Sequence, residues 1–315
     1  MATQKIVPKF RNKSRYQEYA NKISRHWQLY LVIAIPMAFL VTFNYIPMFG
    51  AVIAFKNYNP MQGIWGSPWV GMQHFNVFFQ SPFFWPVINN TLTISAYSLL
   101  IGVPSAILLA VALNEIKHIR FKRTAQMVTY APYFISTVVL VGMMQIVLSP
   151  SVGLYGKFAH LFGVAPDIMG SPTAFPSLYV WSGVWQETGY AAVIYLAALS
   201  SVNPELYDAA KIDGASRFSK IIHIDLPAIR PTIIVLFILA VGQLMNVGFE
   251  KVYLLQNPLN LSTSEVIATY VYKVGLIDAN YSFAVAVGLF QSVIGFILII
   301  IVNFVARKTT DSSLF

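Results

Sequence analysis

Residues 205–231 read ELYDAAKIDGASRFSKIIHIDLPAIRP, a polar stretch rich in small residues between two strongly apolar segments. A segment this polar cannot lie in hydrocarbon, where unsatisfied backbone and side-chain groups are costly. Its small residues recur at helical spacing, which predicts a short helical element that docks against another protein. The apolar segments on both sides of it decide the fold class.

The composition is that of a membrane protein. Hydrophobic residues make up 57% of the 315 residues and charged residues only 10%, whereas soluble domains carry about 25% charged residues. We therefore expect an all-α integral membrane protein. The chain has no cysteine, which excludes disulfides, thiolate catalysis and cysteine-based metal sites. Its five histidines are outside any metal-ligand spacing, so no metal site is predicted.

Six apolar stretches are long enough to cross a membrane, since a helix needs about 20 residues to span roughly 30 Å of hydrocarbon. The expected spans are 27–49, 90–113, 124–148, 175–199, 231–255 and 283–305. Most of the 21 Lys and Arg residues fall on alternate connections, the pattern of cytoplasmic loops. Both termini and residues 205–231 are then cytoplasmic.

The basic residues have a further consequence for partners. Residues 1–26 form a basic tail that is expected to be cytoplasmic and placed to contact anionic membrane lipid. Residues 307–315 form a second cytoplasmic tail. No basic stripe is interleaved with exposed aromatics, so no nucleic-acid partner is predicted.

Residues 27–87 combine the first span with a long aromatic connection on the outer side. Trp65, Trp69 and Trp85 in this connection favour a short helix at the membrane interface. Two interpretations are open. The rings form an aromatic belt, or they grip a partner or a substrate.

Two polar groups interrupt the expected spans. The first consists of Gln186, Glu187 and Tyr190, and the second of Gln243, Asn246 and Glu250 at spacings of three and four. An intramembrane carboxylate usually faces a protein interior or a water-filled cavity. These residues are candidates for a substrate path. The alternative is that they form interhelical hydrogen bonds, with Glu250 paired to the neighbouring Lys251.

The chain carries no recognisable machinery for using energy or making bonds. Gly156–Lys157 is its only Gly-Lys pair, and Ser151 stands where a phosphate-binding loop needs its first glycine. Zinc-protease and Ser-His-Asp signatures are also absent. We therefore predict neither a nucleotide site nor an enzymatic activity on this chain.

The polar stretch has a specific internal order. Carboxylates at Glu205, Asp208 and Asp213 favour a positive helix end and can pair with arginine. Gly214 is expected to end the first turn of helix. A second short helical stretch is expected to stop at Leu226–Pro227, and Pro231 to open the fifth span.

These residues carry a resemblance. Asp208-Ala209-Ala210, Asp213-Gly214-Ala215 and Leu226-Pro227 resemble the EAA loop of transmembrane subunits of bacterial ABC importers, with Asp208 in place of the usual first glutamate. YIPMFGAVIAFKNYNP at 45–60 is similar to permeases of polysaccharide and oligosaccharide importers.

The resemblance implies a type I ABC importer permease fold of six transmembrane helices, with residues 88–306 as the transmembrane domain, in the bacterial inner membrane. It implies a second related permease, two copies of a cytoplasmic ATPase and an extracytoplasmic solute-binding protein. No cofactor is expected on this chain, since ATP and magnesium belong to the ATPase. Oligosaccharide would cross by alternating access. The coupling residues would be Glu205, Asp208, Ala209, Ala210, Asp213, Gly214, Ala215, Leu226 and Pro227.

Other functions are open at this point. An ion-coupled secondary transporter or channel using Glu187 would explain the carboxylate but leave residues 205–231 without a purpose. A membrane-embedded enzyme or scaffold is a further alternative. The sugar is also open. External Lys56, Lys157 and Lys273 are compatible with an acidic, for example uronate-containing, oligosaccharide, whereas Glu187 on the path opposes one.

Overall fold

The computed structural model describes residues 24–309, and the chain divides into two compact units, residues 1–52 and residues 53–315. All regular elements in the described residues are helices, apart from an isolated antiparallel bridge between Lys56 and Trp69. The expectation of an all-α protein is confirmed. Most of the basic tail 1–26, and residues 310–315 of the second tail, lie outside the described residues.

The first unit is built on one long apolar helix. It comprises α2 (Trp27–Leu40), the π-turn η1 (Val41–Tyr45), α3 (Ile46–Met48) and the first residues of the 3-10 turn η2 (Phe49–Phe55), which ends in the second unit. Together they form a helical stretch of 29 residues, Trp27–Phe55, with no buried residue in α2. A helix that is apolar on all sides is suited to lipid or to another subunit.

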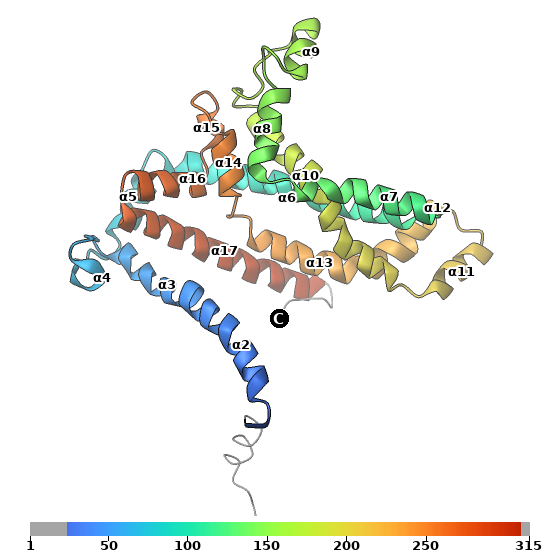
Figure 1. Cartoon of the computed structure of the whole chain (residues 1–315), viewed down its shortest axis with the longest axis horizontal. Coiled ribbons are helices and arrows are strands. Elements are labelled where there is room, and N and C mark those ends of the chain that lie inside the picture. Colours follow the sequence, from blue (N-terminus) through green and yellow to red (C-terminus); the bar gives the residue numbers. More distant parts are fainter. Residues whose placement is uncertain (1–23, 310–315) are drawn as a thin grey trace, which may run out of the picture. The chain divides into compact units, whose positions relative to one another are not determined.

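The second unit holds short helices and a bundle of long ones (Figure 1). Its first helices are α4 (Gly63–Gly66), α5 (Gln73–Gln80), α6 (Phe84–Asn114), α7 (Ile119–Tyr130), η3 (Ala131–Phe134), α8 (Thr137–Val147), α9 (Leu154–Phe162) and α10 (Phe175–Ser200). They are followed by α11 (Pro204–Ile212), α12 (Arg217–Lys220), the π-turn η4 (Ile221–Asp225), α13 (Leu226–Gly242), α14 (Phe249–Leu255), α15 (Leu261–Ser264), α16 (Ile267–Tyr272), the π-turn η5 (Lys273–Ile277) and α17 (Tyr281–Thr309).

Four helices in the described residues are long and apolar enough to cross a membrane, or five if one bent pair counts as a span. They are Trp27–Phe55, Phe84–Asn114, Arg217–Gly242 and Tyr281–Lys308, and the bent pair is Ile119–Phe134 with Thr137–Val147. Helix α10 has 26 residues but carries polar side chains in its middle. The six-span count and the cytoplasmic position of the termini stay predictions.

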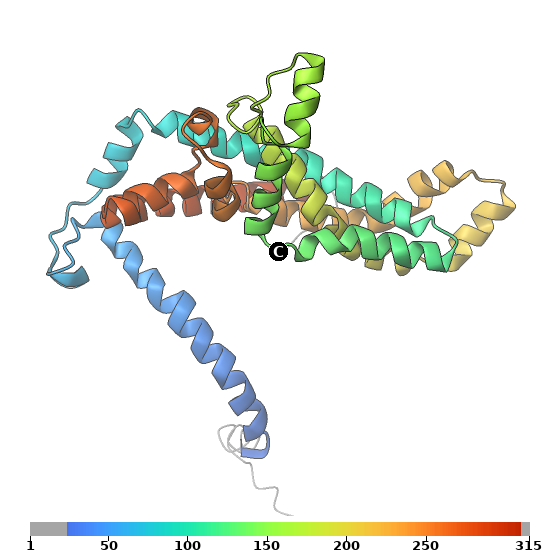
Figure 2. The same ribbon diagram turned by 45° about the horizontal axis from the view of Figure 1, so that its top comes forward.

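The span expected at 124–148 is not one continuous helix, because α8 leaves the preceding helix at an angle of 96°. Pro132 lies in the tight turn η3, and Ile135 after it has an extended backbone. Ser136 then starts a new helix, since its side chain accepts a hydrogen bond from the Val139 N–H at 3.4 Å. In Figures 1 and 2, α8 turns away from the line of α7, and α9 lies beyond it, away from the bundle.

The helix stop predicted at Leu226–Pro227 is also wrong. One continuous helix runs from Arg217 to Gly242. It contains the π-turn Ile221–Asp225 directly before the proline. A proline ring clashes with the carbonyl group four residues earlier, and a widened π-turn gives that carbonyl room. Pro227 is therefore the second residue of α13 and does not end the helix.

The far end of the expected span 231–255 differs as well, because the helix ends at Gly242 and a new one begins at Phe249. The stripe predicted for Gln243, Asn246 and Glu250 on one helix is thus wrong. Gln291 of α17 donates to the Met245 carbonyl at 2.7 Å and to Asn246 Oδ1 at 3.1 Å. The Gln291 side chain thus supplies a hydrogen bond to a backbone carbonyl group that has no helical partner here. In apolar surroundings such a group needs a partner.

The bundle core lies between α6, α10 and α13. Ala106 and Ala110 of α6 are buried against Ala192 and Tyr195 of α10, and Ile229 of α13 closes this cluster. Small side chains at these positions let the helix backbones approach closely. This core holds α10 and α13 in fixed contact with α6.

Candidate functional site

A cavity of about 470 Å³ lies between α6, α10 and the end of α13. This volume is within the range of about 300–1,000 Å³ that ligand sites occupy. Its walls are mostly apolar, with polar groups at Ser95, Ser98, Tyr179, Glu187, Thr188, Gln243 and Asn246. An apolar cavity with a few polar groups is the usual form of a small-molecule site.

Three of the six predicted path residues lie in this cavity. Glu187 comes from α10, and Gln243 and Asn246 come from the segment after α13. The Asn246 amide donates to Gln243 Oε1 at 3.0 Å. Within the part of the chain that the structure describes, Glu187 makes neither a hydrogen bond nor an ion pair within 4.0 Å. Its carboxylate is available to a ligand.

The other three predicted path residues lie elsewhere. The Gln186 side chain donates to the Ile135 carbonyl at 2.7 Å, and the Tyr190 ring stacks on Tyr133 with centroids 4.0 Å apart. Both contacts fall on the bend between α7 and α8. Glu250 is exposed on α14 and is not among the residues that line the cavity. A path role for these three stays a prediction.

Sequence reasoning missed Lys251, which it treated as a local partner of Glu250. Lys251 is 7% exposed and forms no ion pair with Glu250. Its ammonium donates to the Tyr179 carbonyl at 3.0 Å and lies 4.8 Å from the centre of the Tyr179 ring. The signal was in the sequence, because an ionisable residue inside an apolar segment is itself a pointer to function.

The predicted coupling segment forms two short capped helices. Asn203 caps α11 by accepting a hydrogen bond from the Glu205 N–H at 3.1 Å, and Ser216 caps α12. Gly214 lies just after α11 with φ of 71°, a conformation that favours glycine. The Ala215 N–H then bonds to the Ala210 carbonyl at 2.8 Å. Local residue chemistry therefore determines this segment.

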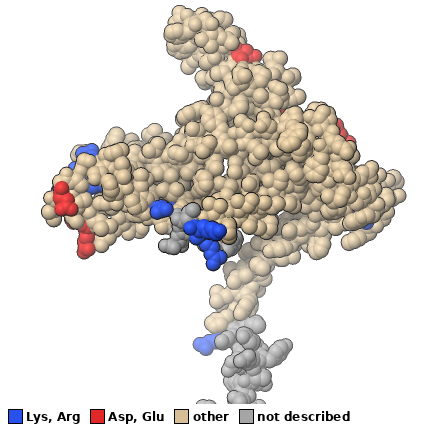
Figure 3. Space-filling model, turned by 180° about the vertical axis from the view of Figure 1, so that it is seen from behind, with Lys and Arg blue, Asp and Glu red and all other residues tan. Residues whose placement is uncertain are grey.

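The segment exposes apolar side chains on α11 and at the start of α12. Ile212 is 86% exposed, Phe218 72% and Leu206 51%. The predicted coupling carboxylates of Asp208 and Asp213 are exposed beside them. Figure 3 shows acidic and basic residues at the left end, where α11 and α12 lie, and a second group of basic residues at the lower middle, while most of the face shown is uncharged. Exposed apolar groups rimmed by charges mark a protein-binding surface.

A long-range contact connects this segment to the bundle. The Tyr207 hydroxyl on α11 donates to the carboxylate of Asp225, which is fully buried just before α13. Burial and this carboxylate raise the pKa of Tyr207 to about 12, against a smaller opposing effect of Asn114 at the end of α6. Tyr207 therefore stays a neutral donor at physiological pH.

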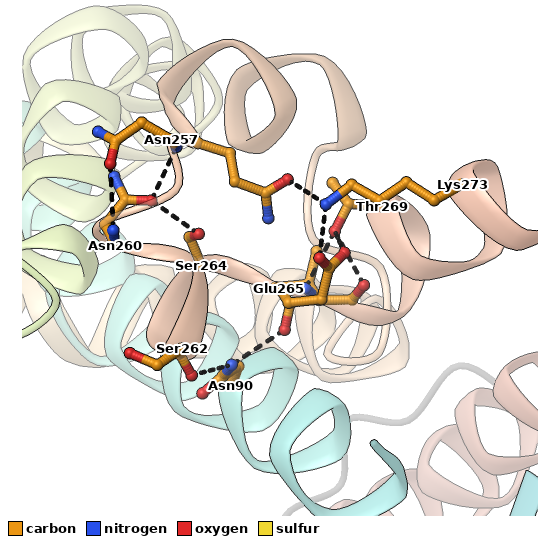
Figure 4. A network of polar contacts seen from close by, with 10 residues as sticks. Asn90, Asn257, Asn260, Ser262, Ser264, Glu265, Thr269 and Lys273 are labelled. Atoms are coloured by element: carbon orange, nitrogen blue, oxygen red, sulfur yellow. Dashed lines mark hydrogen bonds and ion pairs between the residues drawn. The ribbon is translucent and has the colours of Figure 1, made fainter. Parts of the chain in front are cut away.

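The opposite end of the bundle carries a dense polar cluster formed by Asn90, Asn257, Asn260, Ser264, Glu265, Thr269 and Lys273 (Figure 4). Lys273 pairs with Glu265 and donates to Gln256 at 2.8 Å. Lys56, in the loop before α4, donates to the carbonyls of Ile64 and Trp65. Both lysines, which the sequence offered as evidence for an acidic sugar, thus have structural partners.

A helical bundle with an apolar surface and a cavity of ligand size is typical of membrane transport subunits. Residues 98–311 match the family described as binding-protein-dependent transport system inner membrane component, and the chain belongs to this family. It is a multi-pass inner-membrane permease of the ABC transporter class, for carbohydrate import. The family resemblance in the sequence is confirmed.

Two relatives from Bacillus subtilis (strain 168) are similar over nearly their whole length. The protein LplB is 40% identical over 294 residues, which cover 93% of this chain and 92% of LplB. The polygalacturonan/rhamnogalacturonan transport system permease protein YteP is 39% identical over 304 residues, covering 96% of this chain and 95% of YteP.

A solved structure has the same fold. It is a chain of a bacterial ABC transporter involved in the import of the acidic polysaccharide alginate, with a TM-score of 0.85 and 37% identity. The match covers 93% of this chain and 99% of that one. The same similarity holds for the alginate transporter in complex with an alginate pentasaccharide-bound periplasmic protein.

Proposed function

We propose that this permease translocates an oligosaccharide, delivered by an extracytoplasmic solute-binding protein, by alternating access. In this proposal a second related permease completes the membrane domain. Two copies of a cytoplasmic ATPase bind at α11 and α12 and supply the energy from ATP and magnesium. The family to which the chain belongs supports this assembly.

The proposal rests on how the exposed segment is connected to the cavity walls. Helices α10 and α13 both line the cavity, and the α11–α12 segment is the connection between them. The Tyr207–Asp225 hydrogen bond ties α11 to the start of α13. A displacement of α11 by an ATPase would therefore reach both cavity walls, because packed helices shift between discrete arrangements.

The cavity contents suit a sugar. Hydroxyl-rich ligands need several hydrogen-bonding groups, and Glu187, Gln243 and Asn246 supply a carboxylate and two amides within one cavity. Each of these side chains can accept a hydrogen bond from a sugar hydroxyl group, and the two amides can also donate one. The apolar remainder of the wall suits the ring faces of a sugar.

The proposal is tested with the complete complex in proteoliposomes, by measuring uptake of labelled oligosaccharide and recovery of the ATPase. Ile212→Asp places a charge on the apolar docking surface and should lower both at least tenfold. Ile212→Val keeps the surface apolar and should retain both. Asp208→Arg is a second probe of the same surface, with the same expected direction.

The rival function is an ion-coupled transporter that uses Glu187. Its specific support is the free carboxylate in the cavity. Uptake by this chain alone on a proton or sodium gradient, without ATP or ATPase, would show that the rival is right. If uptake strictly requires the ATPase, and is lost in the variant Ile212→Asp, the ion-coupled function is excluded.

A further inference from the structure

The surroundings of Lys251 compensate the charge of its ammonium group only in part. An ammonium group has three N–H donors, and in the described residues Lys251 has one hydrogen-bond acceptor, the Tyr179 carbonyl. The Tyr179 ring adds a cation–π contact at 4.8 Å. Burying an ammonium group in apolar surroundings is costly unless hydrogen bonds or an opposite charge compensate it. Helix packing alone would not need a charge here.

The ammonium lies against the wall of the cavity. Tyr179 and Gly183 both line the cavity, and a side-chain carbon placed on Gly183 would be 3.2 Å from Lys251 Nζ. Because Gly183 has no side chain, that residue does not screen the ammonium from the cavity. In a site of low dielectric constant, the Lys251 charge can attract a ligand in the cavity without touching it.

Glu187 lies one helical turn after Gly183 on α10, so the two residues share a face. The Glu187 carboxylate and the Lys251 ammonium interact electrostatically but are not within ion-pair distance. The cavity therefore has a negative group in its lining and a positive group behind it. Glu187 alone would repel an anionic ligand, and Lys251 offsets that repulsion.

We propose that Lys251 is a specificity-determining residue, whose buried ammonium offsets Glu187 and lets the cavity accept the carboxylate groups of an acidic oligosaccharide. The inference rests on the proposed function, because it needs the cavity to be the sugar path. Glu187 remains free to accept hydrogen bonds from sugar hydroxyl groups. The chain thus carries part of the substrate selectivity itself, in addition to what a binding protein contributes.

The experiment compares two probes with the same skeleton, trigalacturonate and its fully methyl-esterified, uncharged form. Uptake of each is measured with the complete complex in proteoliposomes at a saturating amount of binding protein. Lys251→Met should lower uptake of the acid at least tenfold and of the ester less than twofold. All variants use the same binding protein. The preference of that protein for one probe therefore cancels when the uptake by each variant is divided by the uptake by wild type.

Three further variants separate specificity from stability. Lys251→Arg retains the charge and should restore the preference for the acid. Glu187→Gln should shift the acid-to-ester ratio upward, opposite to Lys251→Met. Lys308→Met removes an exposed lysine at the end of α17 and should change uptake of neither probe. The amount of assembled complex and its ATP hydrolysis with acid-loaded binding protein are measured in parallel.

The outcomes are distinguishable. An equal loss of both probes in Lys251→Met, together with less assembled complex, would overturn the inference in favour of a structural role. Wild-type uptake of the ester but not the acid would also overturn it, and would leave the proposed function intact. If wild type imports neither probe nor any neutral oligosaccharide with ATP, the proposed function itself fails.

Discussion

The two ends of the second unit are held together in different ways. At the α15 end, side chains bond to partners far away in sequence, as when Asn90 donates to the carbonyls of Ser262 and Glu265. At the α11–α12 end, Asn203 and Ser216 cap their own helices, and only Tyr207 reaches further, to Asp225. One end is fixed by a network and the other by few contacts.

The difference indicates a division of labour. A region with many long-range buried hydrogen bonds opens only at high free-energy cost, whereas a region with few buried contacts moves readily. A segment that is to move together with an ATPase needs to be attached by few buried contacts. In the proposed mechanism, the α15 end would be the rigid frame against which α11 and α12 move.

The largest loss of stability is expected for a substitution at the α15 end. Asn260 is fully buried, donates to the carbonyls of Met169 and Leu255, and accepts from the Ser264 hydroxyl. Asn260→Ala leaves buried partners without a bond and should lower the free energy of unfolding by about 3 kcal/mol. Thermal unfolding of the purified complex, followed by intrinsic fluorescence, measures the change.

Asn76, exposed on α5, is the matched control for this substitution. Asn76→Ala should leave the unfolding midpoint where wild type has it. Equal midpoints for both variants would mean that the polar cluster contributes no rigidity, and the contrast between the two ends would then be wrong.

A smaller effect is expected at the α11–α12 end. Tyr207→Phe removes the hydroxyl that donates to the buried Asp225 carboxylate. Hydrogen bonds to charged groups are worth about 1.5–3 kcal/mol, so we expect a loss of about 2 kcal/mol. Because this contact attaches α11 to α13, sugar uptake per ATP hydrolysed should also fall.

Tyr155→Phe is the control, since its hydroxyl donates to the Ala165 carbonyl at 3.3 Å in an exposed loop. That variant should lose about 0.5 kcal/mol at most and keep its transport coupling. If Tyr207→Phe loses stability but keeps normal coupling, the contact is only structural and does not transmit motion.

The smallest effect concerns pH. The pKa of Tyr207 is raised from 10.0 to about 12, first by burial and then by the Asp225 carboxylate. The corresponding stabilisation is complete below pH 10 and is lost as the pH rises from 10 towards 12. Solvent screens a partly exposed group, so the change is modest. Unfolding midpoints of wild type and Tyr207→Phe should therefore converge in this range, and parallel curves would contradict it.

Much of the bundle follows from the sequence alone. The long apolar runs predicted α6 and α17, and polar residues 205–231 predicted an exposed helical segment that Gly214 terminates. These features depend on local chemistry, that is, on apolar length, capping side chains and a glycine at positive φ. The family resemblance in the same segment was correct for this reason.

The breaks in the helices did not follow from the sequence. The bend after Pro132 and the end of α13 at Gly242 interrupt two of the expected spans. Conversely, Pro227 was expected to end a helix that continues through it. In each case the outcome depends on where displaced carbonyls find room or donors, as when Gln291 bonds to the Met245 carbonyl from another helix.

The candidate site divides in the same way. Glu187, Gln243 and Asn246 were predicted and share one cavity, whereas Gln186 and Tyr190, close neighbours of Glu187, contact the bend instead. Helical spacing shows which residues share a face but not which neighbour that face meets.

The sequence by itself determined the membrane setting, the exposed segment at 205–231 and the transport class, because hydropathy, capping and turn chemistry act over a few neighbouring residues. Only the tertiary structure decided that Lys251 is buried behind Gly183 and Tyr179, and that Tyr207 reaches Asp225. Burial and charge compensation depend on distances between helices far apart in the chain, and the packing of α6, α10 and α13 sets those distances.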